Sequence, residues 1–125
     1  MRLVDEYLAA IEAADAGRIL ALFADGATVD SPLYGQVLAS EFYPRLFDDT
    51  ARSQLRLRSV MVGETIENRP TVAFWFDFDW TLSDGTRAPF TVVDVAELDH
   101  DGRIRTLHIL YDTAPLRASF DALPG

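Results

Sequence analysis

The chain has 125 residues, of which 49% are apolar, with a formal net charge of −9 and no cysteine. This length and apolar content fit one globular domain over residues 1–125 rather than a disordered chain. The composition excludes disulfides and thiolate chemistry, and two histidines are too few for a histidine metal cluster. The negative charge repels phosphate backbones and anionic lipids, so we expect no nucleic acid or membrane partner. We also expect no cofactor and no metal, and a site made of carboxylates alone is the one kind of metal site that the composition leaves open.

The N-terminal segment predicts a helix. Apolar residues recur at helical spacing from Leu3 to Ala14, and Gly17 is expected to end this helix. Asp5 and Glu6 interrupt the apolar stretch that a signal peptide requires, and no apolar run has the length of a membrane span. We therefore expect a cytoplasmic protein.

Three short elements are expected next. A second helix over residues 18–23 should end at the turn Asp25-Gly26. Residues 28–30 predict a short strand that Pro32 stops, because proline cannot donate a backbone hydrogen bond to a sheet. Ser40 is a suitable cap for a third helix.

From residue 55 onward the apolar period changes from that of a helix to that of a strand. Turns are expected at Asp84-Gly85 and Asp101-Gly102, both strong hairpin signals. Four extended segments are predicted, over residues 55–62, 71–82, 88–98 and 103–111. Helices followed by hairpin-linked strands indicate an α+β domain with the helices on one face of a curved antiparallel sheet.

The loop at Asp84-Gly85 decides which side chains share a face of the sheet. A two-residue loop places Trp75, Asp77 and Asp79 on the same face as Asp94. Asp77 and Asp94 would then lie close together, which raises one carboxyl pKa and suits acid–base chemistry. A three-residue loop would invert this arrangement, because a slip of one residue moves every side chain to the other face. The alternative is that these acids lie on a solvent-exposed face of the sheet and take no part in chemistry.

The chain resembles the nuclear transport factor 2-like superfamily, in its ketosteroid isomerase and SnoaL-like polyketide cyclase branches. The resemblance extends from Tyr7 to about Arg117 and rests on the order and spacing of four patterns. These are AADAGRILALFADGATVDSP, a glycine seven residues before Phe42-Tyr43, FTVVDVAEL and DGRIRTLHILYD. The resemblance implies a cone-shaped fold, in which a strongly bent antiparallel sheet wraps around the N-terminal helices and encloses an apolar pocket for a small apolar molecule.

The resemblance also implies which residues form the site. Tyr7 and a protonated Asp94 match the two groups that donate hydrogen bonds to an enolate oxygen in ketosteroid isomerase, and Tyr43 matches a tyrosine that supports the first. If the acidic face is the inner one, the pocket is lined by Trp75, Asp77, Asp79, Phe90, Val92, Asp94, Leu107, Ile109 and Tyr111. The aromatic row of Phe74, Phe76, Phe78 and Trp80 would then lie outside, where we expect a homodimer to cover it. His108 is expected to point outward.

The general base of the isomerases has no counterpart. The family places an aspartate before the proline that ends the first strand, and this chain has Ser31 there, while Phe23 replaces a further tyrosine. We expect Ser31 to contact a ligand and Asp77, or else Asp79, to act as the base. The cyclases and epoxide hydrolases take a carboxylate from the last strand, near Ile109, where this chain has none.

Three functions follow. The first is an acid–base enzyme acting on a small apolar carbonyl compound or epoxide, as an isomerase, cyclase or hydrolase, with Tyr7, Asp94 and Asp77 as catalytic residues. The second is a module that binds a small apolar ligand without chemistry, which the missing base at Ser31 favours. The third is an association domain that dimerises through the outer sheet face.

Overall fold

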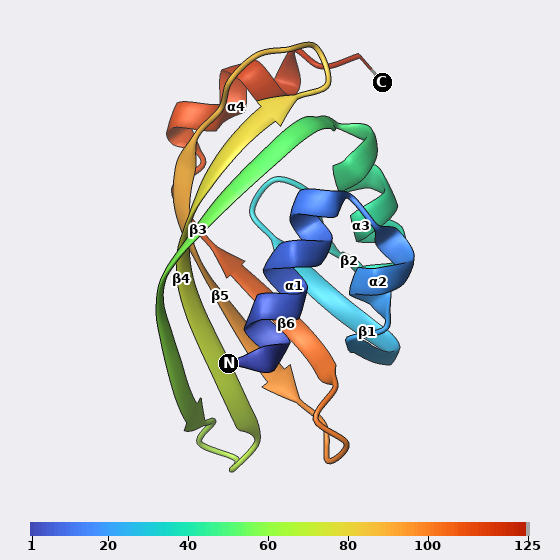
Figure 1. Ribbon diagram of the computed structural model, residues 1–125, viewed down its shortest axis with the longest axis vertical. Helices are drawn as coiled ribbons and strands as arrows, with labels where there is room; N and C mark the ends of the chain where they lie inside the picture. The colour runs from blue at the N-terminus through green and yellow to red at the C-terminus, as the bar shows by residue number, and fades with distance from the viewer. Residues whose placement is uncertain (125) are drawn as a thin grey trace.

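The computed structural model describes residues 1–124 and consists of one curled sheet with helices inside its curve (Figure 1). Its six strands lie in the order β2-β1-β6-β5-β4-β3. The elements are α1 (Arg2–Ala13), α2 (Ala16–Leu20), β1 (Phe23–Ser31), β2 (Gly35–Leu38), α3 (Ala39–Asp48), β3 (Thr50–Glu64), β4 (Pro70–Leu82), β5 (Phe90–Leu98), β6 (Ile104–Leu110) and α4 (Ala114–Asp121). This is the α+β cone that the resemblance implied, in which the concave face of the sheet and the helices enclose the core.

The sheet is antiparallel except at one pair of strands. β1 runs parallel to β6, which brings the N-terminal part of the chain against the C-terminal strand. The two long strands β3 and β4 pair over their whole length, with a bulge between Leu57 and Ser59. Bulges bend and twist a strand, which favours the curl seen in Figure 1.

The three hairpins that connect β3, β4, β5 and β6 have three-residue loops. Backbone hydrogen bonds from Thr65, Leu82 and Asp99 to the residues four positions later, 2.8–2.9 Å long, close the three loops. The third loop residue has a positive φ in each, at Asn68 (67°), Gly85 (89°) and Gly102 (80°). Asn and Gly are the residues that adopt this left-handed conformation most readily, so the same local chemistry produces all three turns.

The three-residue loop at Gly85 inverts the predicted faces of the sheet. Phe74 lies opposite Asp94 and Phe76 lies opposite Val92, so these side chains share a face. The two-residue loop was therefore the wrong interpretation, and the aromatic row of β4 is not the outer surface. Phe74, Phe76, Phe78 and Trp80 all lie buried on the concave face, against the helices.

Several predicted boundaries shift for local reasons. α1 ends before Ala14, which takes a left-handed conformation (φ 52°), and Gly17 lies inside α2 rather than after α1. Phe23 begins β1 instead of ending a helix. α3 begins at Ala39, so Ser40 is a helical residue and not the cap.

The sequence patterns did not predict β2 and α4. β2 has only four residues, all at least partly exposed, so it lacks an apolar alternation. α4 follows β6 and lies at one end of the cone, beside the C-terminus (Figure 1). Among residues 1–124, none of the helices is both long and apolar enough to cross a membrane.

Candidate functional site

An apolar pocket lies between the concave face of the sheet, α1 and α3. It contains about 470 Å³ of space free of atoms, including its mouth, of which about 40 Å³ is open to the centres of water molecules. In this conformation the pocket is therefore narrow. Its lining residues are Tyr7, Ile11, Ser31, Tyr34, Phe42, Leu46, Phe76, Phe78, Trp80, Phe90, Val92, Asp94, Ile109 and Tyr111.

Asp94 is the most unusual group in this pocket. Its side chain is 1% exposed, and its Oδ1 atom is the single buried side-chain nitrogen or oxygen in residues 1–124 without a hydrogen-bond partner. Burial raises the pKa of Asp94 to about 8, while interaction with the Tyr7 hydroxyl opposes that rise. At neutral pH the carboxyl group is mostly protonated, so it carries a proton that a ligand oxygen can accept.

Two tyrosines lie next to this acid. The hydroxyl oxygens of Tyr7 and Tyr43 are 2.9 Å apart, so the hydrogen bond implied by the family resemblance is confirmed. Burial raises the pKa of both hydroxyls, and for Tyr7 the neighbouring Tyr43 and Asp94 raise it further. Both stay protonated. When Tyr43 donates to Tyr7, the Tyr7 proton is available to Asp94 or to a ligand.

A second polar group lies where the loop after β1 meets α3 and α4. The Tyr34 hydroxyl donates a hydrogen bond of 2.6 Å to Oδ2 of Asp49, and the Tyr34 backbone N–H donates to Oγ of Ser31 (3.2 Å). Burial raises the pKa of Tyr34, and its hydrogen bond to Asp49 raises it further. Burial also raises the pKa of Tyr111. Sequence reasoning missed Tyr34, since none of the family patterns includes it.

α4 packs against two of the residues that line the pocket. The ring of Phe120 lies 5.1 Å from the Tyr34 ring and 6.2 Å from Trp80, between centroids. Arg117 donates to the backbone oxygen of Pro32 (3.4 Å), and Leu116 is buried. The helix therefore contacts both the loop after β1, through Tyr34, and the sheet, through Trp80.

The structure brings together seven of the predicted site residues. The lining includes Tyr7, Ser31, Phe90, Val92, Asp94, Ile109 and Tyr111. Tyr43 does not line the pocket but lies behind two lining residues: it is hydrogen-bonded to Tyr7 and its ring packs edge-on against Phe42 (4.8 Å). Leu107 is fully buried in the core but does not line the pocket.

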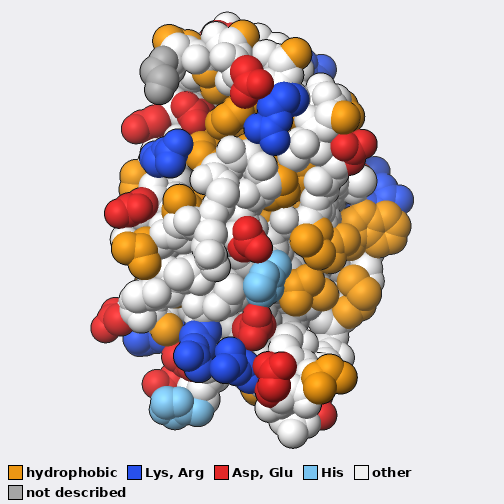
Figure 2. Space-filling model, turned by 180° about the vertical axis from the view of Figure 1, so that it is seen from behind, with side chains coloured by type: hydrophobic (Ala, Val, Ile, Leu, Met, Phe, Trp, Pro, Cys, Tyr) orange, Lys and Arg blue, Asp and Glu red, His pale blue; other side chains and the backbone are white. Residues whose placement is uncertain are grey.

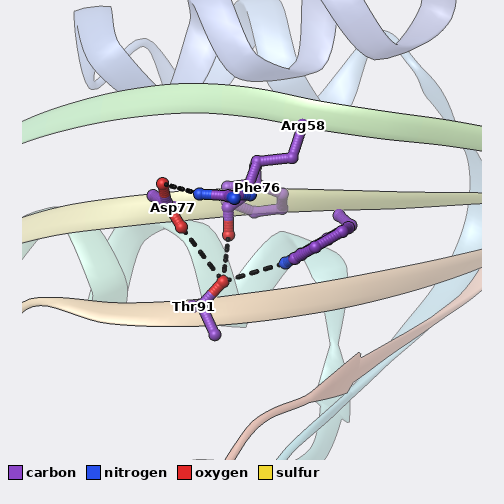
Figure 3. Close-up of polar contacts among 5 residues, drawn as sticks. Arg58, Phe76, Asp77 and Thr91 are labelled. Carbon is purple, nitrogen blue, oxygen red and sulfur yellow. Dashed lines mark hydrogen bonds and ion pairs between the residues drawn. The ribbon is translucent and has the colours of Figure 1, made fainter.

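Three predicted residues lie on the opposite face of the sheet. Asp77 binds Arg58 (3.0 Å) and accepts a hydrogen bond from Thr91 (3.1 Å), as Figure 3 shows. Trp75 is 39% exposed, and its indole N–H donates to the same Thr91 hydroxyl (3.0 Å). Asp79 is paired with Arg87 (2.8 Å). The placement of all three in the pocket was wrong, because the three-residue hairpin loop inverts the register.

This surface position changes the chemistry of Asp77. Its hydrogen bond to Arg58 lowers its pKa, which is the opposite of the rise expected for a carboxyl group beside Asp94. It is separated from the pocket by the sheet itself, so it cannot reach a ligand there. The pocket therefore contains one carboxyl group, Asp94, among residues 1–124.

The outer face carries an apolar patch, which we define as Met61, Ala73, Trp75, Val93, Val95 and Leu110. These residues form two adjacent rows across β3, β4, β5 and β6. Figure 2 shows apolar side chains gathered on this face beside a histidine. His108 does point outward, as expected, and its Nε2 lies 2.6 Å from Oε2 of Glu97.

The fold and site together define a class of protein: a cone-shaped α+β domain with a single protonatable carboxyl group in an apolar pocket. The model of the SnoaL-like domain family matches residues 4–107. The chain therefore belongs to the SnoaL-like domain family.

Solved structures agree with this fold. AclR, a putative hydroxylase from Streptomyces galilaeus, is 18% identical with a TM-score of 0.74, over 99% of this chain and 82% of that one. TerC, co-crystallized with polyporic acid, is 17% identical with a TM-score of 0.76, over 97% of each chain. A nuclear transport factor 2-like protein of unknown function from Exiguobacterium sp. 255-15 is 20% identical, with a TM-score of 0.73, over 88% of this chain and 98% of that one. No curated protein matches the chain.

Proposed function

We propose that the protein is an acid–base enzyme acting on a neutral, flat, apolar molecule that carries a carbonyl or epoxide oxygen. The observation that carries this proposal is Asp94, a fully buried carboxyl group whose Oδ1 atom has no partner and faces an apolar pocket. A buried polar atom without a hydrogen bond is costly, and a catalytic role is one of the reasons for which proteins keep such an atom. A pKa near the operating pH is also what proton transfer requires.

Asp94 alone can both remove and return a proton. As a carboxylate it takes a proton from a carbon next to the carbonyl group: the C–H bond breaks, the Asp94 O–H bond forms, and the electron pair moves to the carbonyl oxygen. Tyr7 donates a hydrogen bond to that oxygen, and Tyr43 holds Tyr7 in place. Asp94 then returns the proton to another carbon, which completes an isomerisation. Alternatively, the Asp94 proton is first replaced by one from solvent, which is returned to the original carbon and completes an exchange.

The charge of the pocket favours a neutral substrate. Among the described residues that line it there is no arginine, lysine or histidine. An anionic group would therefore enter an apolar site without a counter-ion, which costs several kcal/mol. Phosphorylated or free-acid substrates are excluded on this basis.

The test is hydrogen–deuterium exchange next to a carbonyl group in D₂O, followed by NMR on a panel of cyclic ketones and 1,3-diketones. We expect catalysed exchange by the native protein and a loss of about 10²–10⁴-fold in Asp94→Asn. The rate should rise with pH up to about 8, the pKa of Asp94, and level off above it. Asp77→Asn is the matched control, because Asp77 lies on the outer face. Exchange that survives in Asp94→Asn contradicts the proposal.

The second candidate is ligand binding without chemistry. The observation that favours it is Ser31, which stands where the isomerases have their base, in a pocket with no second carboxyl group among the described residues. 1-Tetralone, a neutral aromatic ketone that fits a pocket with no cation among its described lining residues, is a direct first probe for calorimetry. Tight binding of a pocket ligand together with no exchange in any ketone would favour this function over the first.

We further propose that two copies of the chain associate through the apolar patch on the outer face. Trp75 is held there by Thr91 and by the Arg58 guanidinium, 4.8 Å from its ring centroid, and immobilised tryptophans are typical interface anchors. A two-fold axis through β5 would also bring Arg58 on the β3 side of one copy toward the β1 side of the other, where Asp30 lies. This interface replaces the one expected from the buried aromatic row.

A further inference from the structure

The inference concerns Asp49, a residue outside the pocket that contacts it through Tyr34. Asp49 is the residue after α3, and its Oδ2 atom accepts the Tyr34 hydroxyl proton at 2.6 Å. This distance is typical of a strong hydrogen bond from a hydroxyl group to a charged oxygen. Tyr34 lines the pocket, and its hydroxyl group donates a hydrogen bond to the Asp49 carboxylate.

Tyr34 is held in this orientation from several directions. Its ring packs edge-on against Phe42 (5.3 Å) and Phe120 (5.1 Å), and the Arg45 guanidinium lies 5.1 Å from the ring centroid. Its backbone N–H is bound to Ser31. The phenol oxygen therefore has little freedom to choose another partner.

The bond to Asp49 determines what this oxygen can offer to a ligand. A phenol has one hydrogen, and when that hydrogen is bound to a carboxylate only lone pairs remain. The Tyr34 oxygen is then an acceptor. Its raised pKa keeps the hydroxyl neutral, so it does not become a phenolate that would bind a cation instead.

The two polar ends of the pocket thus have opposite character. Asp94 lies in the same row across the sheet as Phe74 and Ile109, and it is a donor when protonated. Tyr34 lies instead against Phe120, which contacts Trp80, six positions along β4 from Phe74. A flat molecule that spans the pocket would satisfy both ends with its carbonyl group beside Tyr7 and Asp94 and a hydroxyl group at Tyr34.

We propose that Asp49 is a specificity-determining residue, which orients the Tyr34 proton away from the pocket and thereby selects substrates with a hydroxyl group at the end remote from the reacting carbonyl. The inference rests on the function proposed for the same pocket and adds the chemical class of its substrate, a hydroxylated cyclic ketone. Asp49 acts through Tyr34 and is a positioning residue.

The experiment compares the binding of matched ketones by calorimetry: 1-tetralone, its 5-, 6- and 7-hydroxy derivatives, and the corresponding methoxy derivatives. We expect the native protein to bind one hydroxy isomer about tenfold more tightly than 1-tetralone, as one good hydrogen bond implies. Tyr34→Phe should reduce this ratio to about one. Asp49→Leu should also abolish the hydroxyl preference and favour the methoxy isomer, because the freed Tyr34 proton can now be donated to an ether oxygen.

Asp49→Asn is the conservative variant. Its side-chain carbonyl oxygen can still accept the hydrogen bond from Tyr34, so the preference for the hydroxy ketone should be retained. If Asp49 acted through its negative charge alone, Asp49→Asn would lose this preference. The hydroxy-to-unsubstituted ratio is taken within each variant, so a distorted pocket that weakens both ketones alike leaves the ratio unchanged, whereas a change in selectivity does not.

Three results would overturn the inference: equal binding of hydroxy and unsubstituted ketones by the native protein, a hydroxyl preference that survives Asp49→Leu, or no binding of any of these ketones. The outcome is independent of proton transfer. If Asp94 fails to catalyse exchange, the binding ratios still decide the role of Asp49, and if the ratios fail, exchange still tests Asp94.

Discussion

The buried Asp94 carboxyl group destabilises the folded protein, because burial opposes its ionisation in the folded state and not in the unfolded chain. Its folded pKa of about 8 is above the ordinary value of 3.8. Between these two values the folded state holds a proton that the unfolded state has released, so stability falls as pH rises from about 4 to about 8 and is level above that.

The residue-scale prediction is that Asp94→Asn removes this part of the pH dependence. We expect the variant to be more stable than the native protein at pH 7, by on the order of 2–4 kcal/mol, since each pKa unit is worth about 1.4 kcal/mol and the new amide loses part of the gain. Urea unfolding from pH 4 to 9 measures it. A difference between the two proteins that does not change over this range would contradict the folded pKa of Asp94.

At the scale of elements, the β4–β5 hairpin determines the orientation of two strands. Gly85 has a φ of 89°, and a Cβ atom there would meet no other atom within 4 Å, so conformation and not space selects glycine. The corresponding loop residue of the β3–β4 hairpin is Asn68. The turn therefore requires a residue that tolerates the left-handed region.

We expect Gly85→Ala to lower the free energy of unfolding by about 1–2 kcal/mol, and Gly85→Asn to cost less. Thermal or urea unfolding of both variants checks the order. Gly63→Ala is the control, because Gly63 has no positive φ and its Cβ atom would make an ordinary contact with Thr71 at 3.7 Å. Equal loss in the alanine and asparagine variants of Gly85 would argue against a conformational cause.

This hairpin also marks the limit of what sequence alone can predict here. The Asp84-Gly85 pair locates the turn, and the hydrogen bond between Leu82 and Thr86 shows that the loop has three residues. Both loop lengths use a glycine with positive φ, so the sequence does not distinguish them, yet they place opposite faces of β4 inward. Tyr7 and Asp94 were found because the family resemblance gives each of them a role, whereas the Tyr34–Asp49 pair depends on how the loop after β1 packs on α3.

At the scale of the whole molecule, the apolar patch predicts a dimer that a single charge should disrupt. Leu110 is 57% exposed within the patch, and Leu110→Arg should convert the dimer to a monomer, because two such charges would meet near the two-fold axis without partners. Light scattering coupled to size-exclusion chromatography measures the mass. Ile66→Arg is the control, since Ile66 is 97% exposed in the β3–β4 loop, outside the patch. A native protein that is monomeric at every concentration tested would refute the interface.

β4 carries two alternating sets of side chains, one facing the core and the pocket and the other facing the outer surface. Its even-numbered residues from Val72 to Leu82 are all buried against the helices, while the odd-numbered residues between them are partly or fully exposed. Substitutions at one set can change which ligand is bound without altering the partner surface, and substitutions at the other can do the reverse. A family built on such a strand can diversify its chemistry and its assembly independently, one residue at a time along the same thirteen positions.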